Sequence, residues 1–234
     1  MCENRTIVTI DGPSGVGKST ISRRLASRLG YTYLDTGAMY RCVGLYCHWH
    51  GVDPDDEQAV SAIIDSIDME LLPPLSPRED IRVFLNGRDV SGEIRTPEIS
   101  MFASRVSALS CVRSRLTQLQ QQMGRRGKIV AEGRDTGTVV FPQAAHKFYL
   151  DADPEERARR RISQLRKSGR PVDKKEIYQQ IIRRDRNDSR RTIAPMQAAP
   201  DAIHIDSTHL SAAEVVEKME TAIREKGGAG RVER

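Results

Sequence analysis

Three glycines, a lysine and a serine near the start of the chain have the spacing of a phosphate-binding loop. Gly12, Gly17, Lys18 and Ser19 fit the pattern G-x-x-x-x-G-K-S/T, and Gly15 lies between them. Glycines allow the backbone to curl around an anion. The lysine adds a charge that reaches the outer phosphates, and the serine hydroxyl suits a Mg²⁺ that bridges phosphate oxygens. The pattern therefore predicts that the loop binds a nucleoside triphosphate.

The segments on both sides of this loop favour the same interpretation. A run of mainly β-branched residues over 6–10 predicts a strand, and Ile21, Leu25 and Leu29 predict a helix that begins near Lys18. The N-terminus of such a helix directs its free N–H groups and the positive end of its dipole at the anion. A glycine-rich turn that occurred by chance would not be expected to have a strand before it and a helix after it.

Other charged residues lie where ligands bind in open parallel sheets. A strand expected over 128–131 is followed by Glu132, Gly133, Arg134 and Asp135, at the carboxyl end where ligands of such sheets bind. A surface salt bridge is the alternative interpretation of that arginine and aspartate.

Two arginines on helices are weaker candidates. Arg41 lies on the second turn of a helix expected to run from a turn at 35–37 to about His50, where a solvated arginine is the default. Arg113 lies in the first turn of another helix, where a cation opposes the dipole and favours a ligand-binding duty. An ordinary structural arginine is an equally good interpretation.

Residues 155–191 form an arginine-rich segment. They contain 14 Arg or Lys and 6 Asp or Glu, whereas the rest of the chain is mildly acidic. Arg184, Asp188 and Arg191 fall at i, i+4 and i+7 and are expected to share one helix face. The segment suggests a moving phosphate clamp, because a guanidinium fork grips phosphate oxygens in bidentate fashion. Ordinary solvated helix charges are the alternative.

The remaining patterns predict further elements. Strands are expected over 31–34, 147–150 and 202–206, and Asn86-Gly87 between alternating runs predicts a small antiparallel insertion over 65–95. Helix-capping signals precede five other helices. They are Thr96-Pro97, Ser110, Asp153-Pro154 with a helix ending near Gly169, Asp173 with Glu176, and Ser211 with Glu214.

Composition restricts the class of protein. A chain of 234 residues fits one α/β domain with insertions. Its four cysteines have no metal-binding spacing and read as free thiols, and no apolar run reaches membrane length. We expect a soluble, cytoplasmic, monomeric protein without membrane or nucleic-acid partners.

Several strings together resemble bacterial cytidylate kinases, the (d)CMP kinase branch of the nucleoside monophosphate kinases. They are IDGPSG-x-GKS, LDTGAMYR, DVSGEIRTPE, GRD-x-GTVVFP and the R-D-x-x-D-x-x-R run of 184–191. The resemblance covers nearly the whole chain. It implies an α/β P-loop NTPase three-layer fold with a central parallel sheet, a small antiparallel β insertion and a helical lid.

The resemblance also implies one cytidylate kinase domain over 1–234. Its core would be about 1–40, 96–152 and 195–226, its monophosphate-binding region about 41–95 and its lid about 153–194. The activity implied is Mg²⁺-dependent transfer of the ATP γ-phosphate to CMP or dCMP.

The roles implied follow residue by residue. The catalytic residues would be Lys18, Arg134, Arg184 and Arg191, and the metal would be held by Ser19, with Glu132 through a water. The ATP contacts would be Gly12, Pro13, Ser14, Gly15, Val16, Gly17, Lys18, Ser19, Thr20, Arg157 and Arg161. The CMP contacts would be Thr36, Arg41, Ser104, Arg113, Arg134, Asp135, Arg184 and Asp188.

Three other functions remain to be distinguished. Another small-molecule kinase with a phosphate loop would differ in its acceptor. A GTP-binding switch is disfavoured because the sequence has no N-K-x-D string. A nucleic-acid ATPase would hydrolyse ATP on DNA without a nucleotide acceptor.

Overall fold

The computed structural model of the protein describes residues 6–76, 79–167 and 172–229. The chain divides into two compact units. The larger unit comprises Met1–Tyr33 and Gly124–Arg234, and the smaller unit comprises Leu34–Met123. Most of the parallel sheet and the phosphate loop belong to the larger unit.

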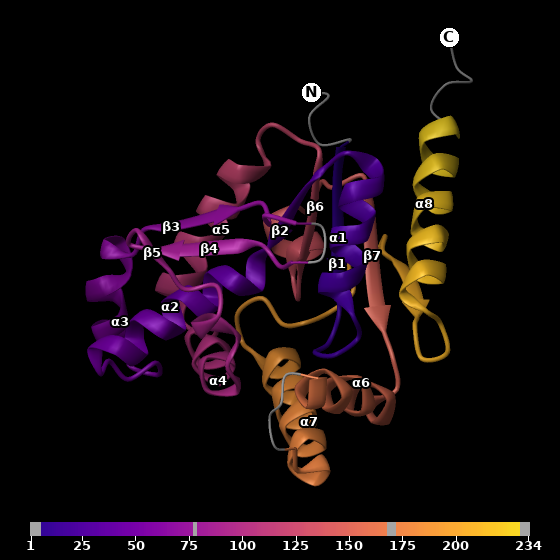
Figure 1. Ribbon diagram of the computed structural model, residues 1–234. Helices are drawn as coiled ribbons and strands as arrows, with labels where there is room; N and C mark the ends of the chain where they lie inside the picture. Colours follow the sequence, from indigo (N-terminus) through magenta and orange to yellow (C-terminus); the bar gives the residue numbers. More distant parts are fainter. Residues whose placement is uncertain (1–5, 77–78, 168–171, 230–234) are drawn as a thin grey trace. The chain divides into compact units, whose positions relative to one another are not determined.

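A five-stranded sheet with the order β2-β6-β1-β7-β8 forms the centre of the fold (Figure 1). The pairs β1–β6, β1–β7 and β7–β8 are parallel. All five residues of the central strand β1 are buried, as expected of a strand covered on both faces. The strands are β1 Ile7–Asp11, β2 Thr32–Asp35, β6 Ile129–Gly133, β7 His146–Asp151 and β8 Ile203–Asp206. The predicted central parallel sheet flanked by helices is confirmed.

Helices α1 (Lys18–Leu29) and α8 (Ala212–Ala229) pack against each other and against this sheet. Ile21 and Leu25 of α1 share one hydrophobic cluster with Val215 and Met219 of α8. The predicted capping box is present at the start of α8, because Ser211 and Glu214 exchange backbone-to-side-chain hydrogen bonds.

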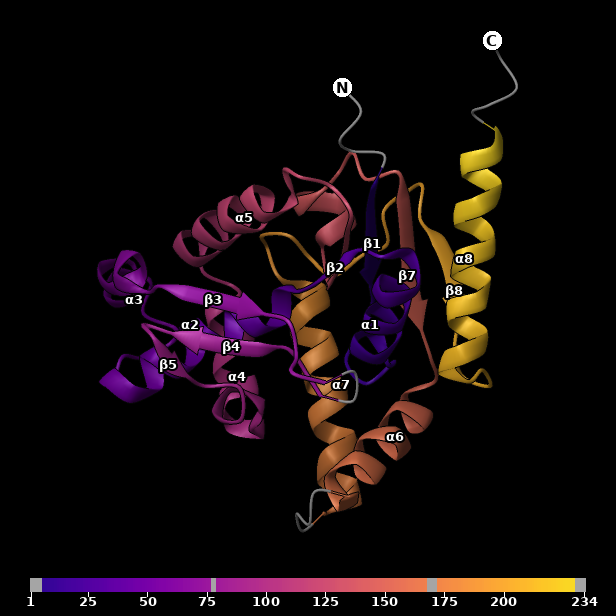
Figure 2. The same ribbon diagram turned by 45° about the horizontal axis from the view of Figure 1, so that its top comes forward.

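Helices α6 (Pro154–Lys167) and α7 (Lys174–Arg190) pack on each other as a pair (Figure 2). The side chain of Asp153 accepts a hydrogen bond from Glu155 N at 2.7 Å, and Asp173 caps α7 in the same way, as predicted. The predicted helix end near Gly169 lies outside the described residues.

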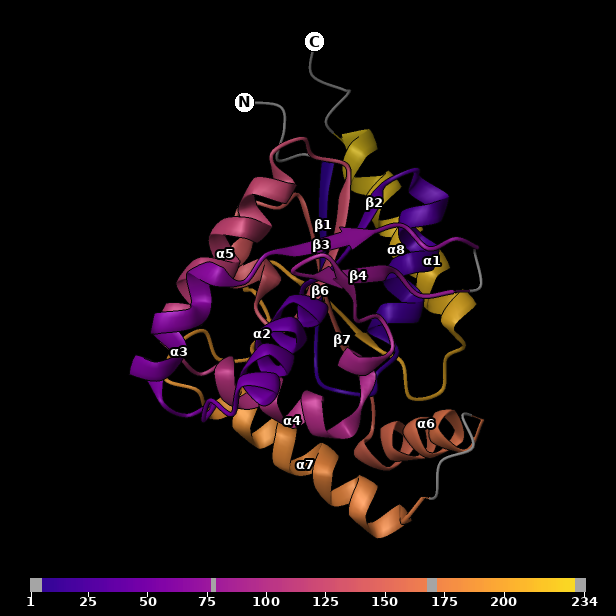
Figure 3. The same ribbon diagram turned by 60° about the vertical axis from the view of Figure 1, so that its left-hand side comes forward.

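The smaller unit contains a separate antiparallel sheet of three strands (Figure 3). The strands are β3 Met69–Leu72, β4 Arg82–Leu85 and β5 Arg88–Asp89. Asn86 and Gly87 both have positive φ, 48° and 77°, which is the hairpin turn that the sequence predicted.

The helices of the smaller unit include two long ones that approach closely. A Cβ at Gly44 would lie 2.9 Å from Ala103 N, so the glycine allows α2 and α4 to meet. The helical elements are α2 Thr36–His50, α3 Glu57–Ile63, η2 Ile64–Ser66, η3 Glu93–Arg95, α4 Pro97–Val106 and α5 Ser110–Gly124.

Two predicted boundaries in the smaller unit were wrong. The expected turn over 35–37 is the beginning of α2, because Asp35 caps the helix by accepting from Ala38 N at 2.8 Å. Ser110 is the first residue of α5 and not its cap. The Glu57 carboxylate accepts from the backbone N–H groups of Ser110 and Cys111 in its place.

Two boundaries in the larger unit also differ. Strand β6 continues to Gly133, so Glu132 is a buried strand residue and not part of the following loop. Residues Thr136–Val140 then form a single π-helical turn, η4, that the sequence did not predict.

The described helices include none that is both long and apolar enough to cross a membrane. Cys42, Cys47 and Cys111 are free thiols, and Cys2 lies outside the described residues.

Candidate active site

The phosphate loop lies at the carboxyl end of the central strand, between β1 and α1. Gly12 has φ 146°, and a Cβ there would lie 1.9 Å from the Leu150 carbonyl oxygen of β7. Gly17 caps α1 with a left-handed φ of 98°. Both positions therefore require glycine, one for close approach and one for its backbone conformation.

The lysine of this loop is buried and points back into the loop. Lys18 Nζ donates to the carbonyl oxygens of Gly12, at 2.7 Å, and Pro13, at 2.6 Å. Burial lowers the pKa of Lys18 well below its ordinary value, and the guanidinium groups of Arg134 and Arg184 lower it further. These three cations are therefore near enough to act on one another, which favours an anion among them.

A hydroxyl and a carboxylate meet beside the lysine. Ser19 Oγ donates to Glu132 Oε1 at 2.7 Å, and the Tyr33 hydroxyl donates to the same oxygen at 2.7 Å. Glu132 also contributes a negative charge near Lys18. Hydroxyl and carboxylate oxygens are the hard ligands that Mg²⁺ prefers, so this pair fits a magnesium site.

Arginine and aspartate side chains from the segment after β6 and from α7 form an ion-pair cluster. Arg134 Nε donates to Asp188 Oδ2 at 2.9 Å, and Asp188 is 4% exposed. Burial opposes ionisation of Asp188, but the charges of Arg134, Arg184 and Arg191 outweigh it, so the pKa of this carboxyl is lowered. The structure thus brings four predicted site residues together.

Arg191 reaches this cluster in an unexpected way. It is the C-cap of α7 with φ −57° and ψ 138°, so it does not continue the helix face of Arg184 and Asp188. Its guanidinium donates to the Ala194 carbonyl at 2.8 Å. The predicted shared face is therefore wrong for Arg191, although its charge still acts on Asp188.

Asp135 is buried, 5% exposed, at the start of the η4 turn. The segment that follows it is fastened to Asp11, whose carboxylate accepts from Thr136 N, Thr136 Oγ1 and Gly137 N at 2.9, 2.7 and 2.7 Å. Burial raises the pKa of Asp11, and these hydrogen bonds oppose the rise. Sequence reasoning missed Asp11. Its position directly before the first loop glycine was the available signal.

Two arginines of α6 reach backbone carbonyls of the phosphate loop. Arg157, 4% exposed, donates to Ser14 O at 3.0 Å and to Ala152 O at 2.9 Å. It also pairs with Asp185 of α7, and Asp185 Oδ1 accepts from Ser14 N at 3.3 Å. The sequence singled out Arg157 but not Asp185, because nothing in the chain's local pattern links position 185 to the loop.

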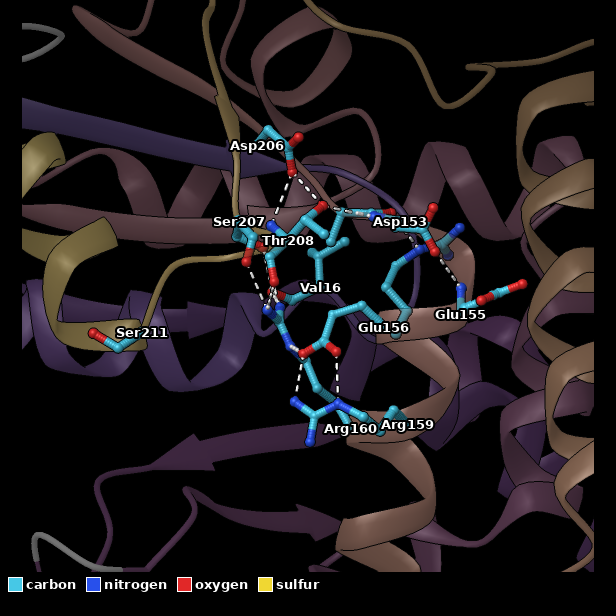
Figure 4. A network of polar contacts seen from close by, with 12 residues as sticks. Val16, Asp153, Glu155, Glu156, Arg159, Arg160, Asp206, Ser207, Thr208 and Ser211 are labelled. Atoms are coloured by element: carbon cyan, nitrogen blue, oxygen red, sulfur yellow. Dashed lines mark hydrogen bonds and ion pairs between the residues drawn. The ribbon is translucent and has the colours of Figure 1, made fainter.

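Arg160 joins the same loop to the segment after β8 (Figure 4). It donates to Val16 O at 3.2 Å and to Ser207 O at 2.6 Å. Arg161, which the resemblance favoured, donates to the side chain of Gln164 on its own helix. Arg160 is thus a residue that sequence reasoning did not select.

In the smaller unit, Arg41 is held by the residue that caps its helix. Arg41 donates to Asp35 Oδ2 at 2.9 Å, and Asp35 is 3% exposed. Thr36, at the first position of α2, is also buried. The helix start therefore presents a fixed guanidinium together with a hydroxyl, a combination that suits a phosphate.

Arg113 and Ser104 are buried polar residues of the same unit. Arg113 donates to the Ser107 carbonyl at 3.1 Å, and its guanidinium lies 5.6 Å from the centre of the Tyr40 ring. Ser104 is 9% exposed, and its hydroxyl has no hydrogen-bond partner among the residues that the structure describes. A buried hydroxyl without a protein partner is suited to a ligand.

The phosphate loop at the end of a central parallel strand, with its buried lysine and a hydroxyl–carboxylate pair, defines a P-loop nucleotide-binding protein. The family model for cytidylate kinase matches residues 8–225. The chain belongs to the cytidylate kinase family.

Named relatives agree with this membership. The chain is 47% identical over 219 residues to the cytidylate kinase of Fervidobacterium nodosum, covering 94% of this chain and 96% of that protein. It is 49% identical over 220 residues to the bifunctional pantoate ligase/cytidylate kinase of Prochlorococcus marinus MIT 9303. That match covers 94% of this chain but 45% of the relative, so the chain spans less than half of the bifunctional protein.

A solved structure shows the same fold at low identity. An uncharacterized protein from Eubacterium ventriosum has a TM-score of 0.50 and 10% identity, with 94% of this chain and 99% of that chain covered.

Proposed function

We propose that this chain transfers the γ-phosphate of ATP to CMP or dCMP and releases ADP and the pyrimidine diphosphate. Membership of the cytidylate kinase family makes it an ATP-dependent nucleoside monophosphate kinase. The observation that carries the proposal is the phosphate loop with Lys18 buried against its own carbonyls, in a chain matched by that family over residues 8–225.

We assign the ATP phosphates to residues 12–20. The backbone N–H groups of the loop and of the start of α1 act as donors to the anion. Lys18 adds a positive charge. The lowered pKa of its side chain should return toward its ordinary value beside a polyphosphate, because an opposite charge favours the ammonium form. Arg157 is assigned to the same substrate because it lies against Ser14, and Arg161 is carried over from the resemblance alone.

We assign Mg²⁺ to Ser19, with Glu132 acting through a water. The hydrogen bond between them supports this, because a serine whose proton is donated to a carboxylate keeps its lone pairs for a cation. Ser19 and Glu132 would hold the cation there, and its positive charge would offset the charge of the phosphates.

We assign Arg134, Asp135, Arg184 and Asp188 to the monophosphate substrate. Cytosine has an exocyclic amine where uracil has a carbonyl. The Asp135 carboxylate can accept a hydrogen bond from the cytosine amine, but it would face another hydrogen-bond acceptor in uracil. A site whose buried polar group is left unpaired rejects the mismatched ligand. Arg134 is suited to the phosphate and Asp188 to the sugar hydroxyls.

The smaller unit supplies its own candidates for the same substrate. Arg41 and Thr36 are assigned to the phosphate, since a guanidinium and a hydroxyl are fixed there at one helix start. Ser104 and Arg113 are assigned to the cytosine edge, and the unpartnered hydroxyl of Ser104 supports that role.

The transfer step needs little covalent help from the protein. The acceptor is already an anionic phosphate, so no strong base is required. Lys18, Arg134, Arg184 and Arg191 spread the charge that develops on the migrating phosphoryl group. The helical segment over 153–194 serves as a lid that keeps water from ATP. We propose that the enzyme acts in the cytoplasm and that it is a monomer. Light scattering tests the oligomeric state.

An acceptor panel tests the proposed activity. Turnover on CMP and dCMP should exceed turnover on UMP and AMP, and highest turnover on AMP would overturn the assignment. In Asp135→Ala, kcat/KM for CMP should fall. The fall should correspond to a loss of about 2–4 kcal/mol of transition-state stabilisation, which is the scale for a buried charged hydrogen bond. Unchanged CMP turnover in that variant would remove Asp135 from base recognition while leaving the kinase activity standing.

A further inference from the structure

Tyr33, a residue of β2, takes part in the arrangement around Glu132. Its hydroxyl donates a hydrogen bond to Glu132 Oε1 at 2.7 Å, and the same oxygen accepts a second hydrogen bond from the Ser19 hydroxyl, also at 2.7 Å. Glu132 is 4% exposed, whereas Ser19 is exposed. A buried carboxylate oxygen is therefore shared between two hydroxyl donors that are 14 positions apart in the chain.

The tyrosine ring has a fixed place from which to make this bond. Tyr33 packs against the hydrophobic cluster of the larger unit, which includes Leu25 and Val130. A phenol extends rigidly from its ring, so packing of the ring determines where the hydroxyl lies. A tyrosine hydroxyl can donate one hydrogen bond, and here it donates that bond to the carboxylate.

Two donors on one oxygen restrict how the glutamate side chain can rotate. A glutamate has three side-chain torsions, and each hydrogen bond removes conformers that point its carboxylate elsewhere. The carboxylate is thereby kept where it accepts the Ser19 proton. The serine lone pairs then remain available to a cation. Tyr33 thus acts on Ser19 through Glu132, because each of the two hydroxyls donates a hydrogen bond to the same carboxylate oxygen.

We propose that Tyr33 is a positioning residue for divalent-metal binding, which fixes Glu132 so that Ser19 is oriented toward the metal of the metal–nucleotide complex. The inference rests on the proposed assignment of Mg²⁺ to Ser19 and Glu132. Groups that hydrogen-bond to metal ligands commonly change metal affinity or activity by about 10- to 100-fold when removed. Since Ser19 still donates to Glu132 without Tyr33, we expect the lower end of that range.

The test measures binding, so it does not depend on turnover. The dissociation constant of ADP is measured by calorimetry for each variant in excess Mg²⁺ and in EDTA, and the ratio of the two constants gives the gain due to the metal. Tyr33→Phe removes only the hydroxyl. Tyr31→Phe is the matched control, because Tyr31 packs against the same cluster. Glu132→Gln and Ser19→Ala report on the metal assignment itself.

We expect Tyr33→Phe to lower the metal gain about 10-fold while its ADP affinity in EDTA stays within about twofold of the parent. Tyr31→Phe should keep the full gain. A merely structural tyrosine would change both ADP constants together and leave their ratio unchanged.

Two results would overturn the inference, and they differ in what else they remove. If Glu132→Gln and Ser19→Ala lose the gain but Tyr33→Phe keeps it, Tyr33 has no positioning role and the proposed metal ligands stand. If Glu132→Gln and Ser19→Ala also keep the full gain, the metal assignment itself fails and takes the inference with it. The acceptor panel continues to test the kinase activity separately.

Discussion

The phosphate loop and the arginine-bearing helices α6 and α7 hold their cations in contrasting ways. Lys18 donates to carbonyls six and five residues before it. Arg157 of α6 reaches a carbonyl 143 residues away, and Asp188 of α7 holds Arg134, which lies 54 residues away in the chain. Lys18 is thus held by the backbone of its own loop, whereas the arginines are held by contacts between distant parts of the chain. Changes in the loop should therefore affect chemistry, and changes in the arginines should affect chemistry and folding together.

Lys18→Met gives the largest expected effect and tests the loop side of this contrast. We expect kcat/KM to fall about 1,000-fold, the scale for losing a preorganised charged donor. The free energy of unfolding should change by no more than about 1 kcal/mol, because the loss of two hydrogen bonds to loop carbonyls is offset by the removal of a buried ammonium group. Steady-state kinetics and urea unfolding measure the two quantities. Lys218→Met, on the exposed face of α8, is the control. A large loss of stability in Lys18→Met would break the comparison.

Arg191→Ala tests whether the end of α7 acts on the transition state. The guanidinium is proposed to meet charge that develops late, so kcat should fall by about 100-fold with little rise in KM. The neighbouring Arg190→Ala should change neither constant by more than a small factor. A pure KM effect in Arg191→Ala would move this arginine to ground-state binding.

Arg157→Ala sharpens the folding side of the comparison. Truncation leaves Asp185 and two backbone carbonyls without their guanidinium, and we expect the free energy of unfolding to fall by about 3 kcal/mol. Arg161→Ala, one turn further along α6, should stay within about 0.5 kcal/mol of the parent. Equal stability losses in the two variants would show that α6 does not fasten the loop through Arg157.

Asp188→Asn has the smallest expected effect, and that effect depends on pH. Because the folded pKa of Asp188 is lowered, its contribution to stability is fully present above the unfolded value of about 3.9 and is lost as pH falls through the folded pKa. The variant should lose about 1.5 kcal/mol at pH 7 and progressively less below about pH 4. Urea unfolding at pH 7, 5 and 3 measures this. The exposed Glu225→Gln should show no such trend, and a deficit in Asp188→Asn that grows in acid would contradict the sign.

The sequence predicted the structural features that depend on interactions between residues close together in the chain. The phosphate loop, the Asn86-Gly87 hairpin and the caps Asp153 and Asp173 depend on backbone conformation and neighbouring N–H groups, which the sequence displays directly. The parallel sheet followed from buried β-branched runs, of which β1 is the clearest.

Long-range partners could not be predicted in the same way. Arg191 leaves the helix because α7 ends at Arg190, and periodicity alone extended the helix by one residue too many. Glu57 caps α5 from another helix, so the obvious candidate Ser110 was the wrong cap. The roles of Asp11 and Arg160 depend on partners more than 40 residues away, which a single sequence does not pair.

The contact of Gly12 with β7 restricts how this enzyme can be redesigned. A side chain at position 12 would collide with the Leu150 carbonyl at 1.9 Å, so the collision is with sheet backbone that cannot move aside cheaply. A mutant library that randomises the loop to accept unnatural triphosphates should keep position 12 constant. Diversity belongs at Ser14, which is half-buried and does not have a positive φ, whereas Val16 is buried in the hydrophobic cluster and should be kept.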